Sequence, residues 1–141
     1  MKNVLSEKRG VYLVNILAII EKKGKVLLGW REKDPFVKKL SWCFPGGRPD
    51  YREDLEKNLL KIVKRKTGLQ VKIKKFVFAK TYTENRKILS IYYHCKYVSG
   101  KEKPAVNIKE LRWVKPEEVK MYFYKSTSLH PTLQKFLKTI R

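Results

Sequence analysis

The feature that most constrains the fold of this chain is one amphipathic helix whose end is marked in the sequence. Residues 54–67 carry apolar side chains at the spacing of a single helix face, namely Leu55, Leu59, Ile62 and Val63. Gly68 follows at the position where helices commonly end in a left-handed cap. Because one apolar stripe needs a second apolar layer to cover it, the helix must pack on another element.

Segments typical of β-strands lie on both sides of this helix. Residues 11–20 (VYLVNILAII) predict a central strand, and a turn around Gly24 leads to a returning strand at residues 26–31. Further strands are predicted at residues 71–78, 79–83, 89–97 and 111–114.

Two more helices are predicted near the end of the chain, one starting at Pro116 and one following Pro131. No repeat, linker or low-complexity tract divides the 141 residues. The order of elements predicts an α+β fold with a mixed β-sheet sandwiched between α-helices, and residues 1–141 are predicted to form a single domain.

The charge of the chain indicates the chemistry of its partner. Thirty-four Lys and Arg face thirteen Asp and Glu, which gives a net charge of +21. Such a charge attracts polyanions and disfavours the compact state by self-repulsion unless a partner offsets it. Lysine-rich surfaces of thermophilic proteins usually carry matching glutamates, which are missing here. The composition therefore favours a nucleic acid or another large polyanion as partner.

Other sequence features exclude several classes of protein. No apolar run approaches the roughly 20 residues of a membrane span, and the N-terminal residues lack the pattern of a secretory signal. An intracellular, cytoplasmic protein without a membrane partner is expected. The two cysteines, Cys43 and Cys95, are too few for a disulfide framework or a zinc site, so both are predicted to lie in or near the core.

From residue 11 to residue 140 the chain resembles a Nudix domain, through the motifs LLGWR, FPGG, TGL and RWV around the predicted helix. The family signature is GX5EX7REUXEEXGU, where U is aliphatic. Counting from Gly47 places Glu53 at the first glutamate, Val63 at the aliphatic position and Gly68 at the closing glycine. The resemblance implies the Nudix fold and, in the family, glutamates on the helix that bind divalent cations, neutralise a diphosphate and help to activate water.

The metal-binding half of the signature is absent from this sequence. Its Arg-Glu pair is Lys61-Ile62, and its Glu-Glu pair is Arg65-Lys66. Two cations and an alkyl group stand where the signature has three glutamates, which changes the local charge by about five units. Magnesium requires oxygen ligands, and none of these three side chains provides one. The sequence therefore predicts no metal, no cofactor and no catalytic residue. Glu53, which the family uses mainly for structure, is predicted to pair with Lys61.

Residues 27–56 are also similar to the GDP-mannose mannosyl hydrolase branch of the family. That branch keeps a helix glutamate where Lys66 stands, and a Gln-His pair where Asn107 and Ile108 stand. Arg31 and Arg48 are retained, and in the branch their counterparts lie near the nucleotide diphosphate. The resemblance implies that phosphate binding is kept and hydrolysis is not.

Three functional hypotheses follow. The first is a catalytically silent Nudix domain that binds RNA, associated with a ribosome or another ribonucleoprotein, by analogy with degenerate Nudix domains in the mitochondrial large ribosomal subunit. The second is a Mg²⁺-dependent hydrolase of nucleoside diphosphate sugars or related nucleotides, with Glu53 and Glu56 as displaced ligands. The third is a nucleotide sensor without turnover. The predicted phosphate-binding residues are Arg31, Arg48, Lys57, Lys61, Lys64, Arg65 and Lys66.

Aromatic and histidine residues add smaller expectations. His94 is predicted to be packed or hydrogen-bonded, not a catalytic base, and His130 to lie at a helix start. The turn residues Arg86 and Lys87 are predicted phosphate contacts. The candidates for stacking on unpaired bases are Tyr82, Tyr92, Tyr93, Tyr122, Phe123 and Tyr124.

Overall fold

The computed structural model describes residues 9–31, 42–105, 107–123 and 129–141, and strand β1 (Leu13–Lys22) lies at its centre. β1 pairs in parallel with β6 (Ile88–Ser99) and antiparallel with β2 (Lys25–Arg31) and with the short β4 (Gly46–Gly47).

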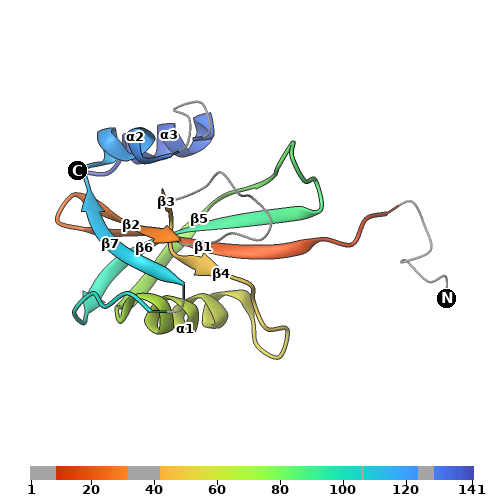
Figure 1. Ribbon diagram of the computed structural model, residues 1–141, viewed down its shortest axis with the longest axis horizontal. Coiled ribbons are helices and arrows are strands. Elements are labelled where there is room, and N and C mark those ends of the chain that lie inside the picture. The colour runs from red at the N-terminus through yellow and green to blue at the C-terminus, as the bar shows by residue number, and fades with distance from the viewer. Residues whose placement is uncertain (1–8, 32–41, 106, 124–128) are drawn as a thin grey trace.

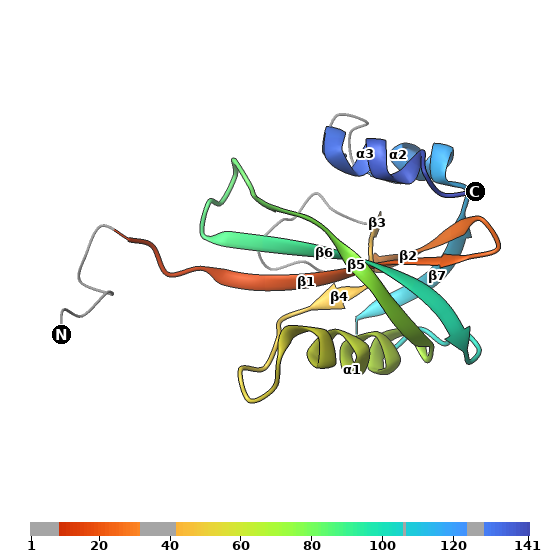
Figure 2. The same ribbon diagram turned by 180° about the vertical axis from the view of Figure 1, so that it is seen from behind.

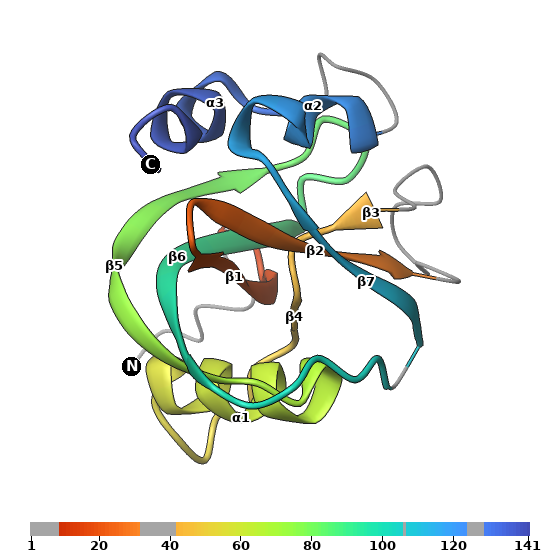
Figure 3. The same cartoon turned by 90° about the vertical axis from the view of Figure 1, so that its left-hand side faces the viewer.

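The remaining strands extend this sheet at both sides. β5 (Gln70–Thr81) pairs antiparallel with β6 and forms one edge. On the other side, β3 (Trp42–Cys43) and β7 (Ile108–Val114) both pair with β2. The sheet is strongly curved, with β5 bending around its outside (Figure 3).

Helices cover both faces of the sheet, as predicted. α1 (Leu55–Thr67) lies on one face, and α2 (Val119–Tyr122) and α3 (Pro131–Leu137) lie on the other (Figures 1 and 2). Two apolar cores result. The core under α1 includes Ile16, Ile20, Leu59, Ile62 and Val63. The core under α2 and α3 includes Ile19, Tyr92, Val119, Leu133 and Phe136.

The predicted limits of α1 are confirmed by its two caps. Asp54 is the N-cap, and its Oδ1 accepts a hydrogen bond from the Lys57 backbone N–H at 2.8 Å. Gly68 ends the helix in the left-handed conformation with φ of 78°, and its N–H bonds to the carbonyl of Lys64. Each cap satisfies a backbone group that the helix leaves without a partner.

Gly46 allows β4 to lie against β1. A Cβ atom at this position would lie 2.2 Å from the carbonyl oxygen of Ile16, far inside van der Waals contact. Because only glycine permits this approach, the Pro-Gly-Gly turn fixes where the chain crosses the centre of the sheet.

Two predictions of elements need correction. The strands predicted at residues 71–78 and 79–83 form one strand, β5. Register shifts between Ile73 and Lys75 and between Phe76 and Phe78 break its alternation, which is why the sequence pattern did not continue through it. The helix predicted from Pro116 begins as a 3-10 helix (Pro116–Glu118) before α2.

The predicted packing and hydrogen bonding of His94 and the predicted position of His130 at a helix start are confirmed. His94 is 9% exposed, its Nε2 lies 2.9 Å from Oε1 of Glu21, and its ring packs edge-on against Phe136. His130 is the N-cap of α3, where Nδ1 accepts from the Thr132 N–H at 3.1 Å. Cys95 is buried as predicted, whereas Cys43 is half-buried and reaches a pocket.

Candidate functional site

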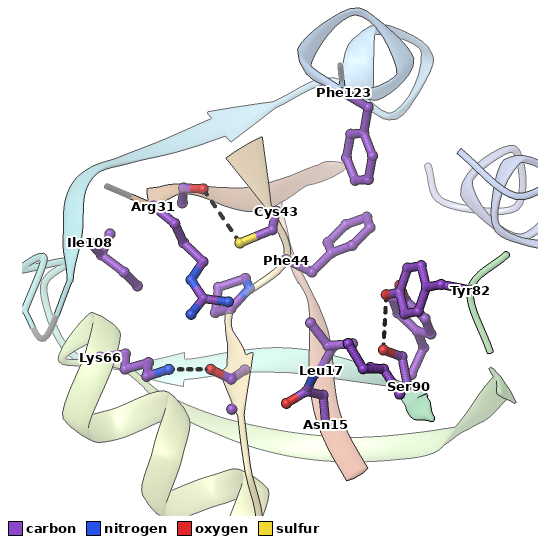
Figure 4. A pocket seen from close by; sticks show the side chains of 16 residues that line it. Asn15, Leu17, Arg31, Cys43, Phe44, Lys66, Tyr82, Ser90, Ile108 and Phe123 are labelled. Atoms are coloured by element: carbon purple, nitrogen blue, oxygen red, sulfur yellow. Dashed lines mark hydrogen bonds between the residues drawn. The ribbon is translucent and has the colours of Figure 1, made fainter. Parts of the chain in front are cut away.

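A pocket of about 60 Å³ opens where the middle of β1, the end of β2, the Pro-Gly-Gly turn and the C-terminal turn of α1 meet (Figure 4). Its two ends differ in chemistry. Arg31 and Lys66 lie at one end, and Tyr82 and Ser90 lie at the other. The pocket therefore joins a cationic end to a hydroxyl-bearing, aromatic end.

Lys66 provides a fixed cation at the first of these ends. Its Nζ donates a hydrogen bond to the carbonyl oxygen of Gly46 at 2.5 Å (Figure 4). Burial, followed by repulsion from Arg31 and Arg65, lowers the pKa of the ammonium group. The ammonium is therefore partly withdrawn from water, and it lines the pocket together with Arg31.

The other positions of the lost glutamates are occupied differently. Ile62 is 3% exposed and packs in the core beneath α1, with Cγ2 3.5 Å from where a Cβ on Gly47 would lie. Arg65 is exposed to solvent. Ile62 thus offers methyl groups, Arg65 a solvated guanidinium, and only Lys66 reaches the pocket.

The residues present do not fit a divalent cation. Among the described residues that line the pocket, none carries a carboxylate, and the described ranges contain no group of three or more His, Cys, Asp or Glu side chains placed to share a metal. Mg²⁺ would compete with the ammonium of Lys66 for the Gly46 carbonyl and would be repelled by it.

Glu53 and Glu56, the candidate displaced ligands, lie outside the pocket. Glu53 forms a hydrogen-bonded ion pair with Lys61, as predicted. Glu56 is exposed in the first turn of α1, where a negative charge suits the helix dipole. Both glutamates therefore lie at the opposite end of the helix from Lys66, and Glu53 is engaged with Lys61.

The seven predicted phosphate-binding residues divide into two sets. Arg31 and Lys66 share the pocket. The others are exposed and do not line it: Arg48, Lys57, Lys61, Lys64 and Arg65. The sequence grouped them through spacing on the helix and through the resemblance, and neither signal separates a side chain that turns into a pocket from one that faces solvent.

Ile108 also lines the pocket. By its spacing from Arg112 and Trp113, this residue stands where the GDP-mannose mannosyl hydrolase branch has the histidine of its Gln-His pair. An isoleucine cannot accept a proton, so the wall of the pocket carries an alkyl group at that position.

Sequence reasoning missed the polar far end of the pocket. The hydroxyl groups of Tyr82 and Ser90 lie 2.9 Å apart, and Asn15 lines the same region. The sequence signal for this polar end is Asn15, which interrupts an otherwise apolar run. Tyr82 lies here as a hydrogen-bonding group; the sequence had suggested a stacking role.

The other aromatic candidates are dispersed. Tyr92 and Tyr93 are buried on opposite faces of the sheet, in the two cores. Phe123 lines the pocket, and Tyr122 packs edge-on against Trp42. Tyr124 lies outside the described residues. Arg86 and Lys87 are exposed in the turn between β5 and β6, and their predicted phosphate contact stays a prediction.

Comparison with known proteins identifies the family. The sequence model of the NUDIX domain matches residues 12–139, so the chain belongs to the Nudix family. No curated protein sequence matches the chain. Membership of the GDP-mannose mannosyl hydrolase branch stays a prediction.

Solved structures with the same fold include three from different organisms. A NUDIX hydrolase from Nitrosomonas europaea is similar with a TM-score of 0.76 and 18% identity, over 92% of this chain and 72% of that one. A MutT protein from Methanosarcina mazei is similar with a TM-score of 0.72 and 20% identity, over 94% of this chain and 95% of that one. An ADP-ribose pyrophosphatase from Streptococcus suis is similar with a TM-score of 0.68 and 21% identity, over 89% of this chain and 90% of that one.

At these identities the similarity establishes the fold alone.

None of the helices in the described ranges is long and apolar enough to cross a membrane.

Proposed function

We propose that this protein is a catalytically silent Nudix domain that binds RNA through its phosphates. The observation that carries the proposal is the hydrogen bond from the Lys66 ammonium to the Gly46 carbonyl, in a pocket that Arg31 also lines. A lysine now provides positive charge at a signature position where the family has a glutamate for its metal.

A fixed ammonium supports binding without supporting hydrolysis. It donates charge-assisted hydrogen bonds to phosphate oxygens, as Lys does in many phosphate sites. It does not lower the pKa of a bound water in the way that a divalent metal does. With Ile108 in the pocket wall, no proton acceptor stands at that position either. The site accordingly retains affinity for a phosphate and lacks the means to activate water.

The extent of the basic surface favours RNA over a small nucleotide. Lys57, Lys64 and Arg65 are exposed on α1 outside the pocket, and no acidic partner pairs with them in the part of the chain that the structure describes. A ligand confined to a pocket of about 60 Å³ would leave these charges unused. A polyanion would reach them, which agrees with a net charge of +21 and with a place in a ribonucleoprotein.

The test reverses two charges at the C-terminal end of α1. Arg65→Glu with Lys66→Glu should weaken binding to single-stranded RNA at least about tenfold and lower the slope of log K against log salt by about 1.4. A matched control, Lys115→Glu with Lys120→Glu, changes the net charge equally at two exposed positions away from the pocket. An unchanged slope in the first variant, or an equal loss in the control, contradicts the proposal.

A second candidate function is nucleotide binding without turnover. The Tyr82–Ser90 hydroxyl pair favours it, because polar groups opposite the cations could orient a ribose or a base. Titration calorimetry with nucleoside mono- and diphosphates in EDTA separates the two candidates. Mononucleotides that bind as tightly as RNA would make the protein a nucleotide sensor.

The alternative of a metal-dependent hydrolase makes a different prediction. It requires Mg²⁺-dependent release of phosphate or sugar from a nucleotide panel, and Glu53→Gln together with Glu56→Gln should abolish that release. The ion pair of Glu53 with Lys61 argues against such a role, since a ligand engaged with lysine is not available to a metal.

A further inference from the structure

The edge strand β5 presents three consecutive side chains to solvent. In a regular strand, successive side chains point to opposite faces. Here the register against β6 shifts between Ile73 and Lys75 and again between Phe76 and Phe78. As a result Lys74, Lys75 and Phe76 are all exposed. Such bulges re-aim side chains and are usually retained for a purpose.

Phe76 is both exposed and held in place. It is 55% exposed, and its ring lies edge-on to the ring of Tyr93, with centroids 6.3 Å apart and planes at 80°. Tyr93 is 8% exposed and belongs to the core beneath α1. Because β5 forms the edge of the sheet, no neighbouring strand in the described chain covers it on its outer side. More than half of this aromatic side chain is thus accessible to a ligand, while its ring packs against a buried residue.

The charges along β5 are of one sign. The strand contains Lys72, Lys74, Lys75 and Lys80 and no acidic residue. Lys75 lies over the ring of Phe136 at 5.6 Å on the α3 side. Lys72 and Lys74 are exposed earlier in the same strand.

This basic edge continues around the C-terminal end of α1. The segment after β6 crosses that end, where the Lys103 N–H bonds to the Thr67 carbonyl at 2.8 Å and the Lys101 carbonyl lies against Gly68 (Figure 3). We call the exposed cations on this path the basic tract: Lys64, Arg65, Lys72, Lys74, Lys101 and Lys103. The tract leads from Phe76 toward Lys66, at the cationic end of the pocket.

The opposite direction is acidic. Burial raises the pKa of Tyr93, and the nearby carboxylates of Glu56 and Asp54, at the N-terminal end of α1, raise it further. An anionic strand that touches Phe76 would be repelled on that side and attracted along the tract. The carboxylates of Asp54 and Glu56 therefore disfavour a path toward the N-terminal end of α1, although Lys57 is exposed in the same turn.

We propose that Phe76 is a stacking platform for an unpaired base of single-stranded RNA, whose phosphates follow the basic tract from Phe76 to the pocket. This inference rests on the proposed function, since it takes RNA as the ligand. Every base offers a π-face, so the contact selects unpaired over paired RNA without selecting a sequence. A second copy of this chain is a poorer occupant, because pairing two β5 edges would bring lysines of like charge together.

The experiment separates the base contact from the phosphate contacts. Binding of an oligouridine, of an abasic strand of equal length and of an RNA duplex is measured for wild type, Phe76→Ala and Phe76→Trp. Wild type should prefer the oligouridine over the abasic strand by about fivefold or more. Phe76→Ala should lose that preference while binding the abasic strand as wild type does, and Phe76→Trp should keep it.

Tyr51→Ala is the matched control. Tyr51 is 101% exposed, but its neighbours include Asp50, Glu53 and Asp54. Removing this aromatic ring from acidic surroundings should leave all three affinities unchanged.

Four results would overturn the inference, and each can be told apart from failure of the proposed function. An equal loss on the oligouridine and the abasic strand, or no loss at all, removes the stacking role while RNA binding stands. Binding of the RNA duplex as tightly as the oligouridine also removes the stacking role while RNA binding stands. If sedimentation shows that the wild type is a dimer and that Phe76→Ala is a monomer, Phe76 contacts a second copy of the chain instead of a base. Only a wild type that binds none of the probes would contradict the proposed function itself.

Discussion

The two ends of helix α1 show how this domain differs from what its family signature specifies. At the N-terminal end, charged and polar groups are paired with one another. Asp50 binds Arg52, Glu53 binds Lys61, and Asp54 caps the helix. Asn58, 6% exposed, has its Nδ2 within 2.9 Å of the carbonyl oxygens of three residues in the preceding turn.

At the C-terminal end, Lys64, Arg65 and Lys66 form a cluster of one sign, and Lys66 is held by the Gly46 carbonyl. These cations do complement the negative end of the helix dipole. They also repel one another, which contributes to the lowered pKa of Lys66. The structural half of the signature is thus present in this chain without the metal-binding half. The paired end supports the fold, and the cationic end is the part that we propose binds phosphate.

The largest expected effect concerns the paired end. Asn58→Ala should lower the free energy of unfolding by about 2–3 kcal/mol, because it removes a buried amide and leaves backbone carbonyls without donors. The control Lys57→Ala, at the exposed neighbouring position, should change it by less than about 0.5 kcal/mol. Urea unfolding measures both. Equal effects for the two variants would erase the distinction between the two ends.

A smaller effect is expected at the cationic end. Lys66→Met should weaken RNA binding about tenfold through the loss of a charge-assisted contact. Its effect on stability should depend on pH. Since burial and like charges lower the pKa of Lys66 in the folded state below its ordinary 10.5, the unfolded chain holds a proton that the folded chain releases in the interval between the two pKa values.

Wild-type stability should therefore rise with pH across that interval relative to Lys66→Met. Thermal unfolding of both proteins between pH 8 and pH 11 checks the sign. A difference that falls with rising pH would mean that Lys66 is stabilised, not strained, by its surroundings.

The smallest effect is expected for the surface ion pair. Glu53→Gln should cost at most about 1 kcal/mol of unfolding free energy, because exposed pairs contribute little, and it should not weaken RNA binding. Chemical unfolding and a binding titration test both statements. A large loss of RNA affinity would show that the acidic end takes part in binding and would contradict the separation of the two ends.

Much of the fold could be predicted because its signals are local. The stripe of Leu59, Ile62 and Val63 and the Gly68 terminus depend on residues close in sequence, and both predictions were confirmed. β5 was divided wrongly because bulges depend on its partner β6. Glu21 could not be recognised as the partner of His94, since 73 residues separate them.

The candidate site was predicted in part. The loss of carboxylates and the pairing of Glu53 with Lys61 are visible in a single signature. The signature does not show which cations enter the pocket, because that depends on how β2 and β4 approach α1. Arg31 and Lys66 meet there, whereas Arg48 does not line the pocket. The exposure of Phe76 could not be predicted from the sequence, because it depends on the register shifts of β5 against β6.

We propose that the ammonium of Lys66 takes the place of the divalent cation as the phosphate-binding charge. The most direct test measures RNA affinity and the integrity of the RNA in EDTA and in Mg²⁺ at constant ionic strength. The account predicts that RNA binds in EDTA at least as tightly as in Mg²⁺ and is recovered intact from both. Binding that requires Mg²⁺, or release of phosphate when Mg²⁺ is added, would contradict it.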